Sequence, residues 1–429
     1  MSDVYRPIVI IDDDPTGTQT TIDFPVLTRW TSERITSLFT QRESAIFFLA
    51  NTRAMDADRA RSIVSEIVQK TATAARATKA SPVFVCRSDS TLRSHFPVEL
   101  ETVRAVWHSS TGERLGPAVF LPAFFEGRRI TRNGIHGILD DDRFVPLHET
   151  EFSRDPEFPY ESAQLHEYVR AKTDSKGVSL RPRPWGDADP DGVWTTDVEQ
   201  YDGPGGLDET VADLRRRLDS GEPLIFQTAA SFIRSWTGQS GWDITASPQR
   251  SGMGPGIVIV GSFVDLSSRQ LERLLTDPSV RGLEIAIDRL LQSPATEVAR
   301  NAAAIERIAA AGFTPVAYTT RGVRTDAGNH RAVGTQVAKA LVEIVRATEF
   351  VPSFVLAKGG ITSHTILRDG LNVSEGRVSG AIIPGVPVIR IQHPKRTEAE
   401  MDYVIFPGNV GTPESLLEVY QRYSGRSNT

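Results

Sequence analysis

Short apolar runs alternate with amphipathic segments along the first half of this chain, and this alternation restricts the fold more than any other feature. Two of the intervening segments, 53–73 and 97–108, place their apolar residues at helical spacing. Strands separated by helices favour parallel pairing with right-handed crossovers, which defines an α/β protein. The runs that we expect to form strands are 8–12, 44–50, 83–87, 118–122 and 224–228.

The second half of the chain repeats the pattern after a break. Glycine and proline concentrate between residues 237 and 256, which is typical of an interdomain linker. Further strands are expected from residue 257 and at 315–318, 354–357 and 386–391, with a long amphipathic helix at 330–346. We therefore predict two α/β domains with mostly parallel sheets and an active-site cleft between them. The domains would comprise residues 1–240 and 255–429.

Composition excludes several classes of protein. The formal net charge of -6 argues against a general surface for nucleic acid or anionic membrane. No apolar run approaches the ~18 residues of a membrane span. A single cysteine, Cys86, excludes an intrachain disulfide and fits a reducing compartment, so we expect a cytoplasmic protein. The eight histidines show no metal-ligand spacing, so no metal-binding residues are predicted.

The first motif is an acidic turn. The apolar run that begins at Ile8 leads directly into Asp12, Asp13 and Asp14, followed by Pro-Thr-Gly. In open α/β sheets ligands bind at the carboxyl end of the strands. Three adjacent carboxylates cost free energy unless a cation, a proton or a substrate hydroxyl relieves them, which favours an active site. The alternative is a solvated loop in which one aspartate caps a helix.

The same turn also fits the first motif of haloacid-dehalogenase-type phosphatases, with Asp12 as nucleophile and Asp14 as acid/base. Those enzymes need a later acidic pair for Mg²⁺, and 140–142 is the only later acidic run that could serve. They also usually carry a bulky apolar residue where this chain has Gly17. The phosphatase therefore remains an alternative hypothesis.

The second motif joins arginines to hydroxyl groups. Residues 87–93, Arg-Ser-Asp-Ser-Thr-Leu-Arg, end one predicted strand, while Arg53 and Arg129 follow two others. A guanidinium matches a carboxylate better than a lysine does, so this edge favours a small anionic substrate. The alternative is a helix capped by Asp89 or Ser90, with Arg87 and Arg93 in solvent.

The third motif is Lys358-Gly359-Gly360-Ile361-Thr362-Ser363, which follows an apolar run. Adjacent glycines let the backbone approach phosphate oxygens, and a helix N-terminus favours negative charge. It is not a Walker A loop, and a tight strand-to-helix turn explains it equally well. Further glycine turns at 384–387 and 407–411 strengthen the prediction of a nucleotide site.

Taken in this order, the motifs resemble those of the four-carbon acid sugar kinase family. The resemblance covers nearly the whole chain, and 89–93, Asp-Ser-Thr-Leu-Arg, is its most specific part. It implies an N-terminal acid-sugar-binding domain and a C-terminal nucleotide-binding domain. The other matching segments are 13–17, 122–129, 261–262, 359–363 and 407–411.

The resemblance implies a kinase that transfers the γ-phosphoryl group of ATP, with Mg²⁺, to a hydroxyl of a tetronate or 3-oxo-tetronate. Asp13 or Asp14 would accept the hydroxyl proton, and Asp12 would support them. Substrate binding falls to Arg53, Asp89, Ser90, Arg93 and Arg129. Nucleotide binding falls to Ser262, Gly359, Gly360, Thr362, Ser363, Gly408 and Asn409. The expected partners are ATP and an acid sugar, and base rates favour a homodimer.

Four positions, in three segments, depart from the pattern of many family members. Ser94-His95 replaces Gly-Asn, Arg128 replaces Gly, and Phe406 replaces Lys. The first two touch the expected sugar site and the third removes a charge near the expected phosphate site. A nucleotide-gated sensor that binds both ligands without turnover is a second alternative, beside the phosphatase.

Overall fold

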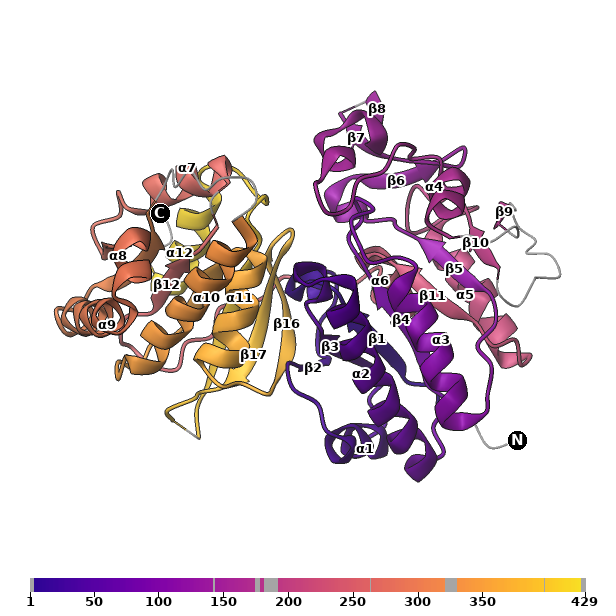
Figure 1. The fold of residues 1–429 in the computed structure, drawn as a ribbon, viewed down its shortest axis with the longest axis horizontal. Coiled ribbons are helices and arrows are strands. Elements are labelled where there is room, and N and C mark those ends of the chain that lie inside the picture. The colour runs from indigo at the N-terminus through magenta and orange to yellow at the C-terminus, as the bar shows by residue number, and fades with distance from the viewer. Residues whose placement is uncertain are drawn as a thin grey trace. The chain divides into compact units, whose positions relative to one another are not determined.

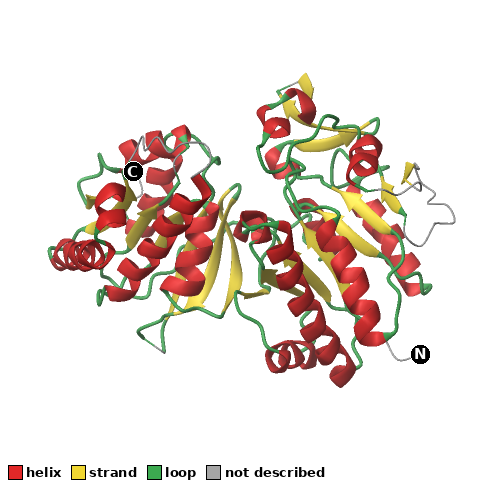
Figure 2. Ribbon diagram, in the orientation of Figure 1, coloured by secondary structure: helices red, strands yellow, loops and turns green. Residues whose placement is uncertain are grey.

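The computed structural model describes residues 4–141, 143–173, 178–180, 192–262, 264–320, 330–396 and 398–425. The chain divides into two compact units, Met1–Asp243 and Ile244–Thr429. Each unit is a sheet with helices on both faces (Figure 2), so the predicted α/β class is confirmed. None of the described helices is both long enough and apolar enough to cross a membrane.

Unit 1 contains a parallel sheet. Its strands, in spatial order, are β2 (Pro25–Leu27), β3 (Ala45–Leu49), β1 (Ile8–Asp12), β4 (Val83–Arg87), β11 (Ile225–Thr228), β5 (Ala118–Leu121), β10 (Val193–Thr195) and β9 (Val178–Leu180). Ile8 to Ile11 are at most 1% exposed. This is the burial expected of parallel strands covered on both faces, and it explains why they appear in the sequence as continuous apolar runs.

Helices cover this sheet on both faces. α1 (Ser32–Thr40), α2 (Ala57–Thr78) and α3 (Val98–Thr111) lie on one face, and α5 (Leu207–Asp219) and α6 (Ala230–Trp236) on the other (Figure 1). α4 (Leu165–Lys172) accompanies a small antiparallel sheet of β6 (Arg129–Arg132), β7 (Ile135–Asp140) and β8 (Arg143–Pro146). Right-handed crossovers in opposite directions along the sheet place the two sets of helices on opposite faces.

Unit 2 has a mixed sheet. Its parallel part consists of β13 (Val280–Ile285), β14 (Thr314–Thr319), β12 (Ile257–Val260), β15 (Val355–Lys358) and β18 (Glu400–Phe406), in that order. β17 (Val386–Gln392) and β16 (Glu375–Ile383) continue it in antiparallel fashion. The helices are α7 (Asp265–Leu274), α8 (Ile287–Gln292), α9 (Pro294–Ala310), α10 (His330–Ala347), α11 (Gly360–Thr365) and α12 (Ser415–Ser424).

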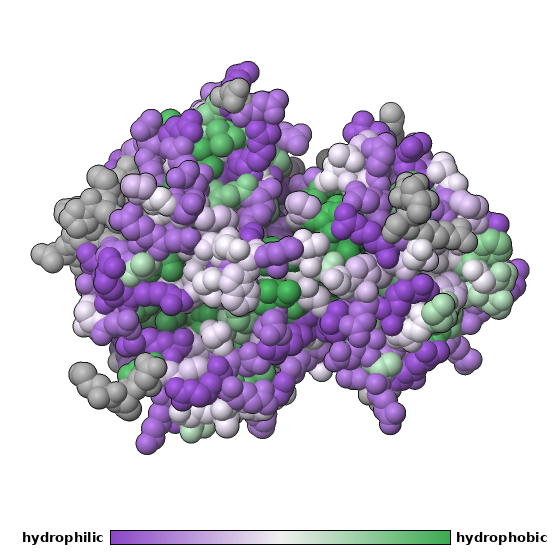
Figure 3. Space-filling view, turned by 180° about the vertical axis from the view of Figure 1, so that it is seen from behind, coloured by the Kyte–Doolittle hydropathy of each residue, from purple (hydrophilic) through white to green (hydrophobic). Residues whose placement is uncertain are grey.

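The structure confirms the predicted strands of the first half and shifts the helix boundaries, since α2 spans Ala57–Thr78 rather than 53–73 and α3 spans Val98–Thr111 rather than 97–108. α2 begins at Ala57 rather than at residue 53, because the Asp56 carboxylate accepts a hydrogen bond from the Arg59 backbone N–H. Thr52–Ala54 instead forms a separate 3₁₀ turn that carries Arg53. Apolar residues reach the face seen in Figure 3 only as small separate patches among polar ones.

Candidate functional site

The acidic turn lies at the carboxyl end of β1, as the sequence predicts. Asp12 is the last residue of the strand, stands in register with Arg87 of β4, and accepts a hydrogen bond from its guanidinium at 3.0 Å. Both side chains are almost completely buried, so Arg87 does not extend into solvent. Gly17 packs against this carboxylate, because a Cβ there would lie 2.0 Å from an Asp12 oxygen.

Asp14 caps the 3₁₀ helix Pro15–Thr18, since its carboxylate accepts a hydrogen bond of 2.9 Å from the Thr16 backbone N–H. One aspartate therefore does cap a helix. The turn is not merely a capped loop, however, because Arg53 reaches across from the end of β3. Its guanidinium lies 3.2 Å from Asp13, 3.0 Å from Asp14 and 3.3 Å from Asp89. Arg53 thus joins the first and second motifs into one site.

Asp89 is the acidic centre of the second motif. It accepts hydrogen bonds from the backbone N–H and the hydroxyl of Thr91, and it pairs with Arg93 at 2.7 Å. Arg93 also lies 3.5 Å from Asp155. Ser90 is buried beside them. Arg53 and Arg93 are therefore both engaged by carboxylates of the protein itself.

The backbone of this motif is fixed by side chains from the β6–α4 region. His136 Nε2 lies 2.8 Å from the Ser90 carbonyl oxygen, and the hydroxyl groups of Tyr160 and Tyr168 donate to the carbonyls of Thr91 and Leu92 at 3.0 and 2.9 Å. Burial lowers the pKa of His136 to about 4, so its imidazole is neutral and donates from Nε2. These three contacts fix three consecutive carbonyls and so the backbone of the second motif.

Arg129 differs from the other arginines of the site. It starts β6 after the turn that follows β5, and its guanidinium lies near the rings of Phe124 and Phe152 at 5.7 and 5.9 Å. Within the described part of the chain it makes no ion pair, and its buried Nε has no hydrogen-bond partner. Burial lowers its pKa, although Asp89 partly opposes this. Among the described residues, Arg129 therefore has a largely buried guanidinium that no carboxylate pairs with.

Burial and the neighbouring arginines give the four aspartates of the site different pKa values. It raises the pKa of Asp12 to about 7 and that of Asp13 to about 6, against the opposing effect of Arg87 and Arg53. At Asp14 and Asp89 the effect of burial is outweighed by neighbouring arginines and hydrogen bonds, so their pKa values are lowered. The Asp14 side chain is 21% exposed and that of Asp13 is 1% exposed. Asp14 is therefore both ionised and accessible.

Sequence reasoning missed Glu99, which lies on α3 and is 1% exposed. Its Oε1 has no hydrogen-bond partner among the described residues. Burial raises its pKa to about 8, and the nearby charge of Asp13 adds to the effect. In the sequence, a glutamate in the first turn of a helix is expected to be exposed and to interact with the helix dipole. Only the tertiary structure shows that Glu99 is buried.

Glycine turns of unit 2 meet around Ser262, at the carboxyl edge of its parallel strands. The Gly261 N–H donates to the Lys358 carbonyl at 3.1 Å, and the Gly359 N–H to the Phe406 carbonyl at 2.8 Å. A Cβ on Gly408 would lie 2.7 Å from Ser262 Oγ, and one on Gly261 would lie 2.1 Å from Thr362 Oγ1. The turns therefore approach so closely that only glycine fits without a shift.

The remaining predicted nucleotide residues occupy different environments. Gly360, Thr362 and Ser363 start α11, but the Ser363 hydroxyl is buried and donates to the Ala357 carbonyl at 2.8 Å. Asn409 is exposed beyond Gly408. Lys358, which was not predicted to act in binding, is buried and donates from Nζ to the Pro407 carbonyl at 2.9 Å. A lysine that ends an apolar strand was the signal available in the sequence.

Comparison with known families identifies the two units. A family model described as a sugar-binding N-terminal domain matches residues 8–230, and one described as a nucleotide-binding C-terminal domain matches residues 257–416. A chain with this pair of domains is a two-domain protein of the sugar-kinase type in architecture. It belongs to the four-carbon acid sugar kinase family. Comparison with curated protein sequences gives no match.

Two solved structures share the fold over nearly their full length. A Haemophilus influenzae protein described as a member of DUF1537 is 15% identical with a TM-score of 0.66, covering 97% of this chain and 100% of its own. A Salmonella typhimurium LT2 protein described as a candidate tRNA synthase is 15% identical with a TM-score of 0.68, covering 98% and 99%. At these identities the likeness establishes the fold.

No cluster of three or more His, Cys, Asp or Glu side chains within the described ranges has the geometry to hold a metal ion. In the acidic turn, the carboxylates are instead paired with Arg53 and Arg87. Mg²⁺ is commonly bound through substrate phosphates with one or two carboxylates and does not need a dedicated protein cage. The residues present therefore fit a metal ion that arrives with a nucleotide.

Proposed function

We propose that this protein is an ATP-dependent kinase that phosphorylates a hydroxyl group of a four-carbon acid sugar of the tetronate or 3-oxo-tetronate type. The observation that carries the proposal is Arg129, a largely buried guanidinium without an acidic partner in the described structure, beside a cluster of aspartates. A buried cation without a partner is costly, so its retention favours an anionic ligand. A short carboxylic acid rich in hydroxyl groups fits both parts of the site.

Substrate binding divides between charge and hydrogen bonds. Arg129 binds the substrate carboxylate. Two nitrogens of the Arg93 guanidinium are already engaged by Asp89, so Arg93 contributes to the same carboxylate through its remaining N–H groups. Asp89 and Ser90 hydrogen-bond the sugar hydroxyls. Arg53 keeps Asp13, Asp14 and Asp89 close together by offsetting their mutual repulsion.

Asp14 orients the reacting hydroxyl and accepts its proton. It is the accessible member of the acidic turn, and its lowered pKa keeps it ionised at neutral pH. Phosphoryl transfer depends mainly on positioning and charge neutralisation, so a weak base suffices. Asp13 lies behind it and supports its position together with Arg53.

ATP binds unit 2 at the turns of Gly261, Gly359 and Gly408, where an added Cβ would press on Thr362 or Ser262. Backbone N–H groups of such turns suit phosphate oxygens. Gly360, Thr362, Ser363 and Asn409 complete this surface, and Lys358 places a positive charge beneath it. Mg²⁺, bound with ATP, would neutralise the charge that develops on the phosphates.

The geometry does not favour the phosphatase alternative. Asp12 would have to attack phosphorus, but its carboxylate is fully buried, is paired with Arg87 and is covered by Gly17. Its pKa is raised by burial, which also reduces its nucleophilic form near neutral pH.

The test is an ADP-release assay with Mg²⁺, ATP and a panel of erythronate, threonate and 3-oxo-tetronates. We expect ADP and a phosphorylated acid in equal amounts with at least one substrate. Phosphate release from sugar phosphates without ATP would support the phosphatase instead. Binding of both ligands without turnover would make the protein a sensor.

A further inference from the structure

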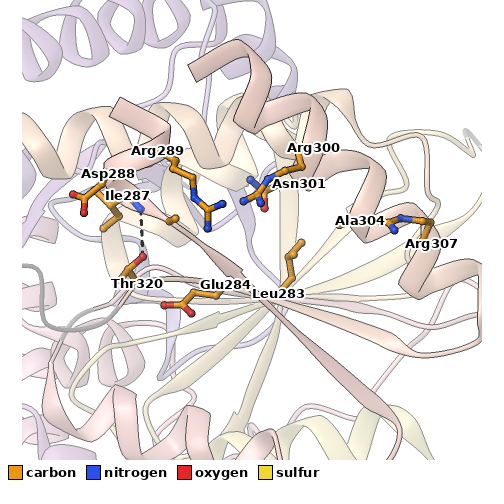
Figure 4. Close-up of a pocket in the computed structure, with 11 residues that line it drawn as sticks. Leu283, Glu284, Ile287, Asp288, Arg289, Arg300, Asn301, Ala304, Arg307 and Thr320 are labelled. Atoms are coloured by element: carbon orange, nitrogen blue, oxygen red, sulfur yellow. Dashed lines mark hydrogen bonds between the residues drawn. The ribbon is translucent and has the colours of Figure 1, made fainter. Parts of the chain in front are cut away.

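A separate cavity of about 430 Å³ lies in unit 2, between the end of β13 and the helices α8 and α9 (Figure 4). Arg289 extends from α8 into the space between Glu284 of β13 and the face of α9. Thr320, directly after β14, closes one side and accepts a hydrogen bond of 3.3 Å from the Ile287 N–H. The volume falls within the range typical of small-molecule sites.

The cavity holds charges of both signs that do not neutralise one another. Glu284, Asp288 and Arg289 are exposed at the mouth of this space and, within the described ranges, form no ion pair. Arg300 pairs with Glu297 of its own helix at 2.6 Å. Arg307 also lines the cavity, so three guanidiniums share it with two carboxylates, and this mixture of hydrogen-bond donors and acceptors suits a polar ligand that carries both kinds of group.

A buried acceptor on α9 gives a second, independent indication of a ligand. Asn301 is 1% exposed and lines the cavity. Its Nδ2 donates to the Glu297 carbonyl at 2.7 Å, whereas Oδ1 has no hydrogen-bond partner among the described residues. A buried polar atom without a partner is rare and costs free energy, so a ligand donor is expected there.

The position of the cavity links it to the glycine turns. β13, β14, β12 and β15 are all parallel, so the cavity and the turns around Ser262 share the carboxyl edge of one sheet. β14 pairs with both β13 and β12, which places β13 two strands from Gly261. At roughly 4.8 Å per strand the separation is about 10 Å, a span that one extended nucleotide can bridge.

We propose that this cavity binds the nucleoside half of the nucleotide, its ribose and base, while the glycine turns bind the phosphates. Glu284 and Asp288 accept hydrogen bonds from ribose hydroxyls, a role that an acidic residue also has in dinucleotide-binding folds. Asn301 Oδ1 accepts from an exocyclic amine of the base. The planar guanidinium of Arg289 stacks on the base. The inference rests on the proposed function of unit 2 as the ATP site.

The experiment compares ATP with inorganic tripolyphosphate, which carries the phosphates without a nucleoside. Dissociation constants are measured by calorimetry on the full chain for Asp288→Ala and Arg289→Ala. Glu272→Ala and Arg269→Ala on α7 are matched controls, because they likewise remove one acidic and one basic side chain, from exposed positions that do not line the cavity. Circular dichroism checks that all four variants fold.

We expect each cavity variant to weaken ATP binding about tenfold, with tripolyphosphate binding within about twofold of the parent protein. The controls should change neither constant. The inference is overturned if ATP binding is unchanged in both cavity variants, or if tripolyphosphate binding falls as much as ATP binding. The latter result would assign the cavity to phosphate.

These outcomes separate the inference from the proposed function. If the parent protein binds ATP and the variants show the expected pattern, but no acid sugar is phosphorylated, the nucleoside site stands and the kinase proposal is overturned. If the parent protein phosphorylates acid sugars but the cavity variants bind ATP as tightly as the parent does, the kinase proposal stands and the nucleoside site is overturned. A parent protein that binds neither ATP nor tripolyphosphate overturns both.

Discussion

Replacing Arg129 by alanine removes the charge that the proposed substrate carboxylate needs. In the structure this guanidinium contacts two aromatic rings, and within the described ranges it contacts no carboxylate. Its loss therefore leaves no protein acid without a partner. If the arginine instead paired with an acid of the protein, its replacement would leave that acid without a partner and lower the free energy of unfolding.

The size of the effect follows from the type of contact. Truncating one partner of a buried, hydrogen-bonded charge pair costs about 2–5 kcal/mol, so we take about 3 kcal/mol for the bound substrate. That corresponds to roughly a hundredfold rise in KM for the acid sugar. Without substrate, the loss of two ring contacts is offset by removing a buried unpartnered cation, so the free energy of unfolding should change by less than about 1 kcal/mol.

Arg128→Ala is the matched control. Arg128 is the preceding residue, is exposed, and pairs with Asp141 at 3.3 Å on the surface. Exposed pairs contribute little, so KM for the acid sugar should stay within about twofold. Steady-state kinetics for both substrates and urea denaturation of each variant give the full comparison.

Two results would refute the reasoning about Arg129. One is a KM for the acid sugar that Arg129→Ala leaves unchanged. The other is an equal loss of affinity for ATP and acid sugar, accompanied by a large loss of stability, because this is the signature of a structural residue.

Other variants test the remaining parts of the site. Asp14→Asn should lower kcat by about a thousandfold with an unchanged dissociation constant for ATP, and near-normal turnover would leave Asp13 as the base. Glu99→Gln should flatten the pH dependence of the free energy of unfolding, measured by urea denaturation. Because the pKa of Glu99 is raised to about 8 in the folded protein, its protonated form stabilises the fold at low pH, and this contribution is lost as the pH rises from about 5 to about 9. A matching pH slope in both proteins would contradict burial of a protonated Glu99. Gly261→Ala places a Cβ 2.1 Å from Thr362 Oγ1 and should weaken ATP binding more than about tenfold, whereas Gly241→Ala, with open space around it, should not.

Periodicity and turn chemistry predicted much of the fold, because parallel strands buried on both faces appear as uninterrupted apolar runs. The same rule predicted that the acidic turn and the arginine motif lie close together, because the carboxyl ends of parallel strands meet at one edge, and Arg53 does contact both. Short or polar elements such as β2 and the exposed edge strand β13, of sequence Val-Arg-Gly-Leu-Glu-Ile, were missed because no periodic pattern marks them. Long-range contacts were also beyond sequence reasoning. The burial of Arg87 against Asp12 and the unpartnered state of Arg129 depend on residues tens of positions apart.

The departures from the family pattern acquire physical explanations in the structure. Arg128 has a φ of 58°, in the left-handed region where glycine is free of strain, which explains why other members can use glycine there. His95 does not join the sugar site directly. Its Nε2 lies 3.1 and 2.9 Å from the carbonyls of Thr52 and Met55, on either side of Arg53, so it fixes the turn that carries that arginine.

Phe406 illustrates how a missing charge can be supplied by a neighbouring strand. Phe406 of β18 stands in register with Lys358 of β15, and the Lys358 ammonium lies 4.1 Å from the centre of the Phe406 ring. A lysine at either of these paired positions would reach the same turn at Gly408, since Lys358 already donates to the Pro407 carbonyl beside it. Lys358 therefore places a positive charge beneath the proposed phosphate site, so Phe406 alone does not argue against a kinase.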